Sequence, residues 1–288
     1  MARIISGNRT AEDIVRAHLE QKQREEAQKR TSPAPAPNQT SSSPQPNHHP
    51  AQIAAVAQDY ITVRGITCVD ADGNVTEQYP ALYVKRDIER NGAQHINFTP
   101  YKVASDFEKQ GSFLPSIALT CNIMSTLYPH RSDADVKRFL LQYQNHGAGH
   151  GYHAQNTVIN YRTQEIVHYP SAADFNQREA VNASQRKINR FDKTTLQDCL
   201  LEHALKDAAH TRYVKQLTGL VKPEVLVEIG TYFGKPAQLW FPWNGQAGAG
   251  FNEIRAAWFG CISNYLDLSG DYDLVISNAA RGVRLGAP

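Results

Sequence analysis

Residues 255–288 read RAAWFGCISNYLDLSGDYDLVISNAARGVRLGAP, and this stretch guides the interpretation of the whole chain. Its two ends are built from Arg, Ala and apolar residues, whereas its middle mixes Asn, Tyr, Asp, Ser, Ile and Val without a helical or strand period. Small polar residues are common in turns, so one interpretation is an ordinary loop followed by a strand. Several apolar residues in the middle do not suit a turn: Phe259, Cys261, Val275 and Ile276.

The composition of this stretch points to a second interpretation. From Phe259 to Pro288 the chain contains no Lys, Gln, Glu, Met or Trp. These are the residue types whose codons never end in a pyrimidine. The residue types that are present can all arise when the first two bases of an Asn codon are freely replaced. The residue types of this stretch are therefore limited to those with a codon that ends in a pyrimidine, and we call this limit the codon constraint. They do not follow a helical or strand period.

In this respect the chain resembles the variable proteins of diversity-generating retroelements. In that family an error-prone reverse transcriptase randomises adenines copied from a template repeat. The resemblance rests on two motifs, RAAWF (Arg255–Phe259) and ARGVRL (Ala280–Leu285). It also rests on the residues between them, whose types can all arise by replacement of the first two bases of an Asn codon. It is clear over residues 226–288 and diffuse over residues 55–225. The family implies a C-type lectin-like fold, related to formylglycine-generating enzymes, in which the closing Gly-Val-Arg forms the last core strand.

The resemblance implies two sets of functional residues. The expected scaffold is Arg255, Trp258, Arg281, Gly282, Val283 and Arg284, with the guanidinium groups of Arg281 and Arg284 anchoring loop carbonyls or carboxylates. The expected ligand-binding residues are Phe259, Cys261, Ser263, Asn264, Tyr265, Asp267, Ser269, Asp271, Tyr272, Asp273, Val275, Ile276, Ser277 and Asn278. Antibody paratopes use the same Tyr, Ser, Asn and Asp palette, because Tyr offers rigid contact area and small polar residues offer adaptable hydrogen bonds.

We therefore expect a recognition protein that is not an enzyme and uses no cofactor or metal. Its partner is expected to be a protein or another macromolecule, which the sequence does not name. The cysteine pair that serves catalysis in the formylglycine-generating relatives has no match here, because Cys261 stands alone in the variable stretch.

A cysteine-dependent hydrolase is the alternative from a different functional class. It would use His153 with either Cys121 or Cys199. The acidic residue that orients the imidazole in such enzymes is missing around residues 169–171. Both cysteines also lie in predicted helices among apolar residues, where a buried neutral thiol is expected rather than a reactive thiolate.

Three histidines within a short stretch raise the question of a metal site. His146, His150 and His153 occur in NHGAGHGYH, and histidine is a common metal ligand. The intervening glycines do not fix the imidazoles on one helical face, and a further ligand at standard spacing is missing. We interpret the segment as a flexible loop that leads into a strand.

Composition and charge limit the remaining classes of function. The 288 residues include 41% hydrophobic and 20% charged residues, as in ordinary globular proteins. A formal net charge of +2 gives no basic surface for nucleic acid. No apolar run approaches the roughly 18 residues of a membrane span, and residues 1–15 lack a secretory apolar region. We therefore expect a cytoplasmic location.

The sequence predicts three segments. Residues 1–30 are expected to hold a helix over Ala11–Lys29, with residues 10–30 either solvated or docked on a partner. Residues 31–52 are rich in Pro, Ser, Asn and Gln and predict a disordered linker. Residues 53–288 are expected to form the folded domain.

Within the folded domain, helical and strand patterns alternate without a parallel βαβ repeat. A turn at Asp72–Asn74 separates two predicted strands, and another turn at 162–164 predicts a hairpin over 155–170. Helices are predicted within 113–128, 133–145, 194–210 and 222–234, and a buried strand over 237–243. This mixture predicts an α+β fold, which the resemblance narrows to a C-type lectin-like domain with inserted helices.

Overall fold

The computed structural model describes a defined part of the chain. The described residues are 59–88, 90–91, 94–95, 107, 111–145, 151, 153–169, 187–192, 196–241, 254–262, 264–272 and 279–286. Contacts within the chain separate two units, Met1–Ile53 and Ala54–Pro288, and every described residue belongs to the second. The predicted helix at 11–29 and the predicted linker at 31–52 therefore lie outside the described residues.

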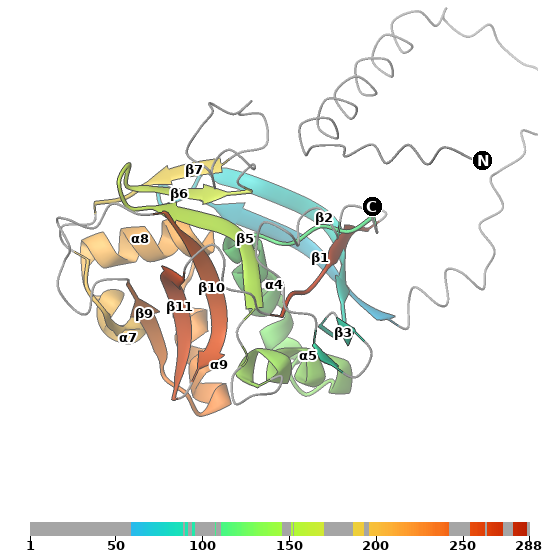
Figure 1. Ribbon diagram of the computed structural model, residues 1–288. Helices are drawn as coiled ribbons and strands as arrows, with labels where there is room; N and C mark the ends of the chain where they lie inside the picture. Colours follow the sequence, from blue (N-terminus) through green and yellow to red (C-terminus); the bar gives the residue numbers. More distant parts are fainter. Residues whose placement is uncertain are drawn as a thin grey trace, which may run out of the picture. The chain divides into compact units, whose positions relative to one another are not determined.

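A curled seven-stranded sheet is the larger of the sheets in the described part of the chain (Figure 1). Its strand order is β7-β6-β5-β10-β11-β9-β8, and neighbouring strands are antiparallel except for β11 and β9, which run parallel. In this order the strands are Lys187–Arg190, Glu165–His168, His153–Asn160, Ile254–Ile262, Tyr265–Tyr272, Ala237–Trp240 and Cys199–Leu200. The β10–β11 hairpin thus occupies interior positions of the sheet.

A second sheet joins the beginning of the domain to its last described strand. It has the order β1-β2-β12, formed by Tyr60–Val69, Val75–Lys85 and Val283–Leu285. The turn between β1 and β2 is fixed by Asp70, whose carboxylate accepts hydrogen bonds from the N–H groups of Asp72 and Asn74. A short ladder pairs β3 (Arg90–Asn91) with β4 (Gln94–His95).

Helix α4 (Ile117–Leu127) is the most deeply buried helix of the described residues. It begins at Ser116, whose hydroxyl accepts a hydrogen bond from the Leu119 N–H. The other helices are η1 (Tyr128–His130), α5 (Ala134–Gln144), α7 (Leu201–Ala204), α8 (Ala208–Thr218) and α9 (Glu224–Phe233). Because α4 contacts both sheets and α8 and α9, it is apolar on nearly every side.

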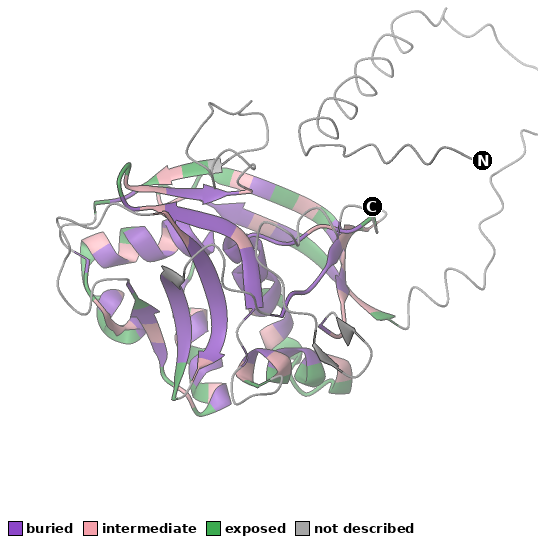
Figure 2. Ribbon diagram, in the orientation of Figure 1, coloured by how far each residue is buried: buried purple, intermediate pink, exposed green. Residues whose placement is uncertain are grey.

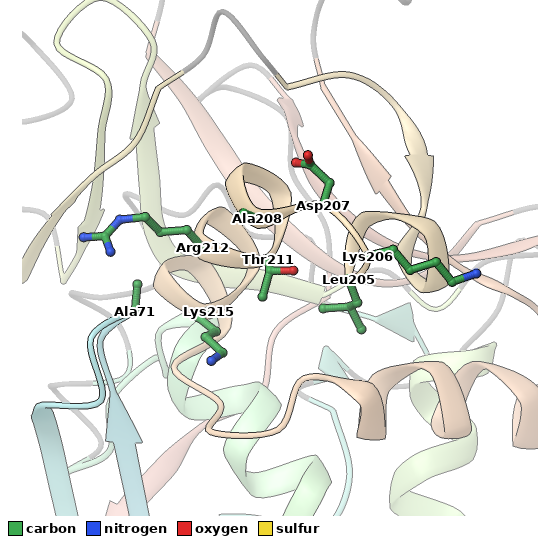
Figure 3. Close-up of a pocket in the computed structure, with 8 residues that line it drawn as sticks. All are labelled: Ala71, Leu205, Lys206, Asp207, Ala208, Thr211, Arg212 and Lys215. Atoms are coloured by element: carbon green, nitrogen blue, oxygen red, sulfur yellow. The ribbon is translucent and has the colours of Figure 1, made fainter.

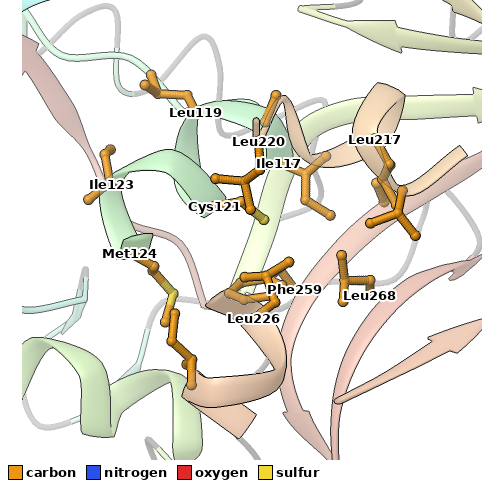
Figure 4. Packing of buried hydrophobic residues seen from close by; sticks show 14 of the residues in the cluster. Ile117, Leu119, Cys121, Ile123, Met124, Leu217, Leu220, Leu226, Phe259 and Leu268 are labelled. Atoms are coloured by element: carbon orange, nitrogen blue, oxygen red, sulfur yellow. The ribbon is translucent and has the colours of Figure 1, made fainter. Parts of the chain in front are cut away.

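The main hydrophobic core surrounds α4 (Figure 4). Cys121 of α4, Leu217 of α8 and Leu226 of α9 belong to the same cluster as Phe259 and Leu268 of the hairpin. Figure 2 shows most of β10 and residues 266–270 of β11 as buried. The hairpin is therefore held by core packing as well as by strand pairing.

Gly219 allows α8 to approach α4 closely. Its φ of 61° lies in the left-handed region, and an added Cβ would lie 3.0 Å from the Ala118 Cβ and 3.1 Å from the Cys68 Cβ. The Asn122 side chain donates hydrogen bonds to the carbonyl oxygens of Thr218 and Gly219. These contacts fix the end of α8 against the centre of α4.

The structure confirms the α+β class and the hairpin predicted over 155–170, and it corrects one predicted helix. Residues 194–210 do not form a single helix, since Cys199–Leu200 is the edge strand β8 and α8 begins only at Ala208. Two side chains favour this division of the predicted helix. The Asp198 carboxylate accepts the Phe241 N–H at 2.7 Å, and the Asp207 side chain caps the start of α8. None of the helices in the described residues combines the length and apolar character needed to cross a bilayer.

A buried histidine connects four elements of this fold. The Nδ1 atom of His168 accepts from the Thr157 hydroxyl, which in turn accepts the N–H of Ile117 at the start of α4. The Nε2–H of His168 donates to the carbonyl oxygen of Gln216 in α8 at 3.1 Å. The neutral imidazole satisfies both contacts, and burial lowers the pKa of His168 from 6.5 to about 4 because it disfavours the charged form.

We predict an acid-dependent loss of stability from this group. Between pH 6.5 and about 4 the unfolded chain binds a proton on His168 and the folded chain does not, so the free energy of unfolding falls as the pH falls. The contribution is about 3 kcal/mol, at about 1.4 kcal/mol per pH unit. Urea unfolding at several pH values measures it. His168→Gln should flatten the pH dependence in this window.

Candidate functional site

The β10–β11 hairpin contains most of the described residues that were predicted to bind a ligand. Across the hairpin, Phe259 is paired with Leu268 and Cys261 with Leu266. All of these side chains are buried in the main core. Side chains of directly paired residues lie on the same side of a sheet, so this side of the hairpin faces the helices.

This placement corrects the prediction for two residues. Phe259 and Cys261 were expected on an exposed binding surface, but each is 0% exposed in the described structure. Burial also raises the pKa of the Cys261 thiol to about 12. Their apolar character serves packing against the core, so neither side chain is available to a ligand in this conformation.

The opposite side of the hairpin carries the polar residues. Tyr265 is paired with Ile262, Asp267 with Gly260, and Ser269 with Trp258. Trp258 belongs to a second, smaller apolar cluster with Phe107, Leu114, Ala154, Ala256 and Ala280. Tyr265, Asp267 and Ser269 therefore lie on the side of the sheet that faces away from the main core.

Strand β9 extends this side of the sheet. In the parallel ladder, Gln238 is paired with Asp267 and Trp240 with Ser269. We call this side of β9, β10 and β11 the outer face; its described residues include Gln238, Trp240, Trp258, Tyr265, Asp267 and Ser269. Exposure is uneven, since Tyr265 is 39% and Trp240 41% exposed whereas Asp267 is 3% and Ser269 0% exposed.

Trp240 and Gln238 were not among the predicted site residues. The sequence AQLWFPW was interpreted as a buried strand. Buried Ala237 and Leu239 alternate with half-buried Gln238 and exposed Trp240, which is the period of a strand with one accessible side. That alternation was a usable signal, although it spans only four residues.

The remaining predicted binding residues are only partly described. Asn264 is exposed at the turn between β10 and β11. Asp271 and Tyr272 continue the backbone of β11, but their side chains lie outside the description. The others are also outside the described residues: Ser263, Asp273, Val275, Ile276, Ser277 and Asn278.

The predicted scaffold residues are all buried or half-buried: Arg255, Trp258, Arg281, Gly282, Val283 and Arg284. Val283 is paired with Val84 in β2 and exchanges backbone hydrogen bonds with Phe113 at 2.8 and 2.9 Å. Arg284 places its guanidinium over the Tyr60 ring. The closing motif thus fastens the end of the hairpin segment to the first sheet.

Arg281 makes the most extensive described contacts of this motif. Its side chain is 2% exposed and donates hydrogen bonds to the carbonyl oxygens of Lys85 and Arg86 and to the Oε1 atom of Gln142. The guanidinium lies 4.2 Å from the centre of the Phe139 ring. Planar geometry and several donors make arginine the residue suited to this set of acceptors.

Neither cysteine of the hydrolase alternative has the surroundings of a nucleophile. Cys121 is fully buried in α4, and burial raises the pKa of its thiol. Cys199 lies in β8 rather than in a helix, and burial followed by the charges of Asp198 and Asp207 raises its pKa as well. His153 is buried against Tyr143, with ring centres 4.0 Å apart. These environments favour neutral thiols over thiolates.

No metal centre is formed by the described side chains. His146 and His150 lie outside the description, and His153 is the first residue of β5. Across the described ranges, no group of three or more His, Cys, Asp or Glu side chains is arranged to hold an ion.

A shallow groove lies elsewhere, between the β1–β2 turn and α8 (Figure 3). Two of its charged lining groups are engaged within the protein: Arg212 forms an ion pair with Asp72 at 2.7 Å, and Asp207 accepts hydrogen bonds from His210. The other lining residues are Ala71, Leu205, Lys206, Ala208, Thr211 and Lys215. The groove has no arrangement of groups suited to catalysis.

Comparisons of the chain with protein-family models, curated proteins and solved structures find no match. The assignment of function therefore depends on the residues and geometry described above.

The two sides of the hairpin should respond differently to truncation. Phe259→Ala removes a fully buried ring and should lower the free energy of unfolding by about 3–5 kcal/mol. Tyr265→Ala removes a ring that is 39% exposed and should cost about 1 kcal/mol or less. Urea unfolding of both variants measures the difference. Equal losses would contradict the separation into core side and outer face.

Arg281→Lys should destabilise the domain although the charge is kept. A lysine cannot satisfy the three acceptors in the same planar arrangement, so we expect a loss of about 2–4 kcal/mol in urea unfolding. Arg190→Lys is the matched control, because the Arg190 side chain is 84% exposed. A loss no greater than that of the control would show that Arg281 does not fasten the closing motif.

Proposed function

We infer that this chain is a non-enzymatic recognition protein whose ligand-binding surface is the outer face together with the turn at Asn264. In this proposal it is a variable protein of a diversity-generating retroelement with a C-type lectin-like domain. Affinity comes from aromatic side chains, and neighbouring polar groups supply specificity. The proposal rests on the codon constraint in residues 259–288 and on the geometry of the hairpin.

The main support for the proposal is that the strand register places alternate residues of the hairpin on opposite sides of the sheet. From Tyr265 to Ser269 the residues alternate, with Tyr265, Asp267 and Ser269 on the outer face and Leu266 and Leu268 in the main core. Of the outer-face residues in this run, Tyr265 is exposed, whereas Asp267 and Ser269 are buried. Variation at Tyr265 and at the turn residue Asn264 can therefore change the exposed surface while the leucine contacts in the core are kept.

Two buried anchors enclose the stretch that this proposal calls variable. Trp258 is 0% exposed before it and Arg281 is 2% exposed after it. Recognition segments are commonly held in this way by a rigid framework. Direct contact with a ligand is assigned to Asn264, Tyr265 and their exposed neighbours, because Asp267 and Ser269 are buried.

The proposal gives the other segments supporting roles. Residues 1–30 dock the protein on a partner, and residues 31–52 act as a tether to the binding domain. A cytoplasmic location agrees with Cys68, Cys121, Cys199 and Cys261, which are all free thiols. No observation among the described residues favours the hydrolase alternative.

Sequencing of the gene and its surroundings tests the proposal. We expect a second copy of the DNA that encodes residues 255–285, with adenines in the codons for Tyr265, Asp267 and Ser269, close to a reverse-transcriptase gene. Codons for Leu266 and Leu268 should be identical in the two copies, because those side chains are in the core. Deep sequencing of this region from a growing population should show substitutions at the adenine positions only.

The proposed diversification would be refuted by a single-copy region whose substitutions are spread evenly along the gene. Variation at the leucine codons equal to that at the outer-face codons would refute the structural part of the proposal. In that case the core packing of the hairpin would not limit which positions vary.

A further inference from the structure

We draw no further inference here: the strongest candidate, the side of the β1-β2-β12 sheet that faces away from the main core and carries Arg64, Lys85 and Arg284, supports no proposal because nothing in the structure shows what covers it.

Discussion

The pairing of β10 with β5 on one side and with β11 on the other is the constraint on which the rest of the domain depends. Because β10 lies inside the sheet, both of its edges are used and its register cannot shift without breaking two ladders. A shift of one residue would also carry Phe259 out of the main core and Trp258 into it. The same register decides which residues of the hairpin pack into the main core and which face away from it.

Burial on both sides of the hairpin makes this surface unlike a free loop. Gly270 shows how tightly the end of β11 is packed, since an added Cβ would lie 2.5 Å from both the Ile159 Cδ1 and the Tyr161 Oη. Tyr161 also donates a hydrogen bond to the Gly270 carbonyl oxygen. The backbone at the end of β11 is therefore held firmly by its surroundings.

Local turns and hairpins could be predicted from the sequence. The side of the β10–β11 hairpin on which each residue lies could not. The turn at Asp72–Asn74 and the hairpin at 155–170 follow from short-range side-chain chemistry and alternation, and both are observed. The helix predicted over 194–210 was wrong because Cys199 pairs with Leu239, a contact that no local pattern reveals. Likewise, the residue types at Phe259 and Cys261 suggested membership of a variable surface, but only the pairing with Leu268 and Leu266 shows that they face the core.

The pairing of β12 with β2 joins residues about two hundred positions apart in the chain, so the domain closes only when its final residues are present. A reading-frame shift or a premature stop within residues 259–278 would remove Arg281 and Val283. Strand β2 would then keep an unpaired edge, and the acceptors at Lys85 and Arg86 would lose their buried donor. The first sheet is therefore complete only in chains that are translated in frame through the closing motif.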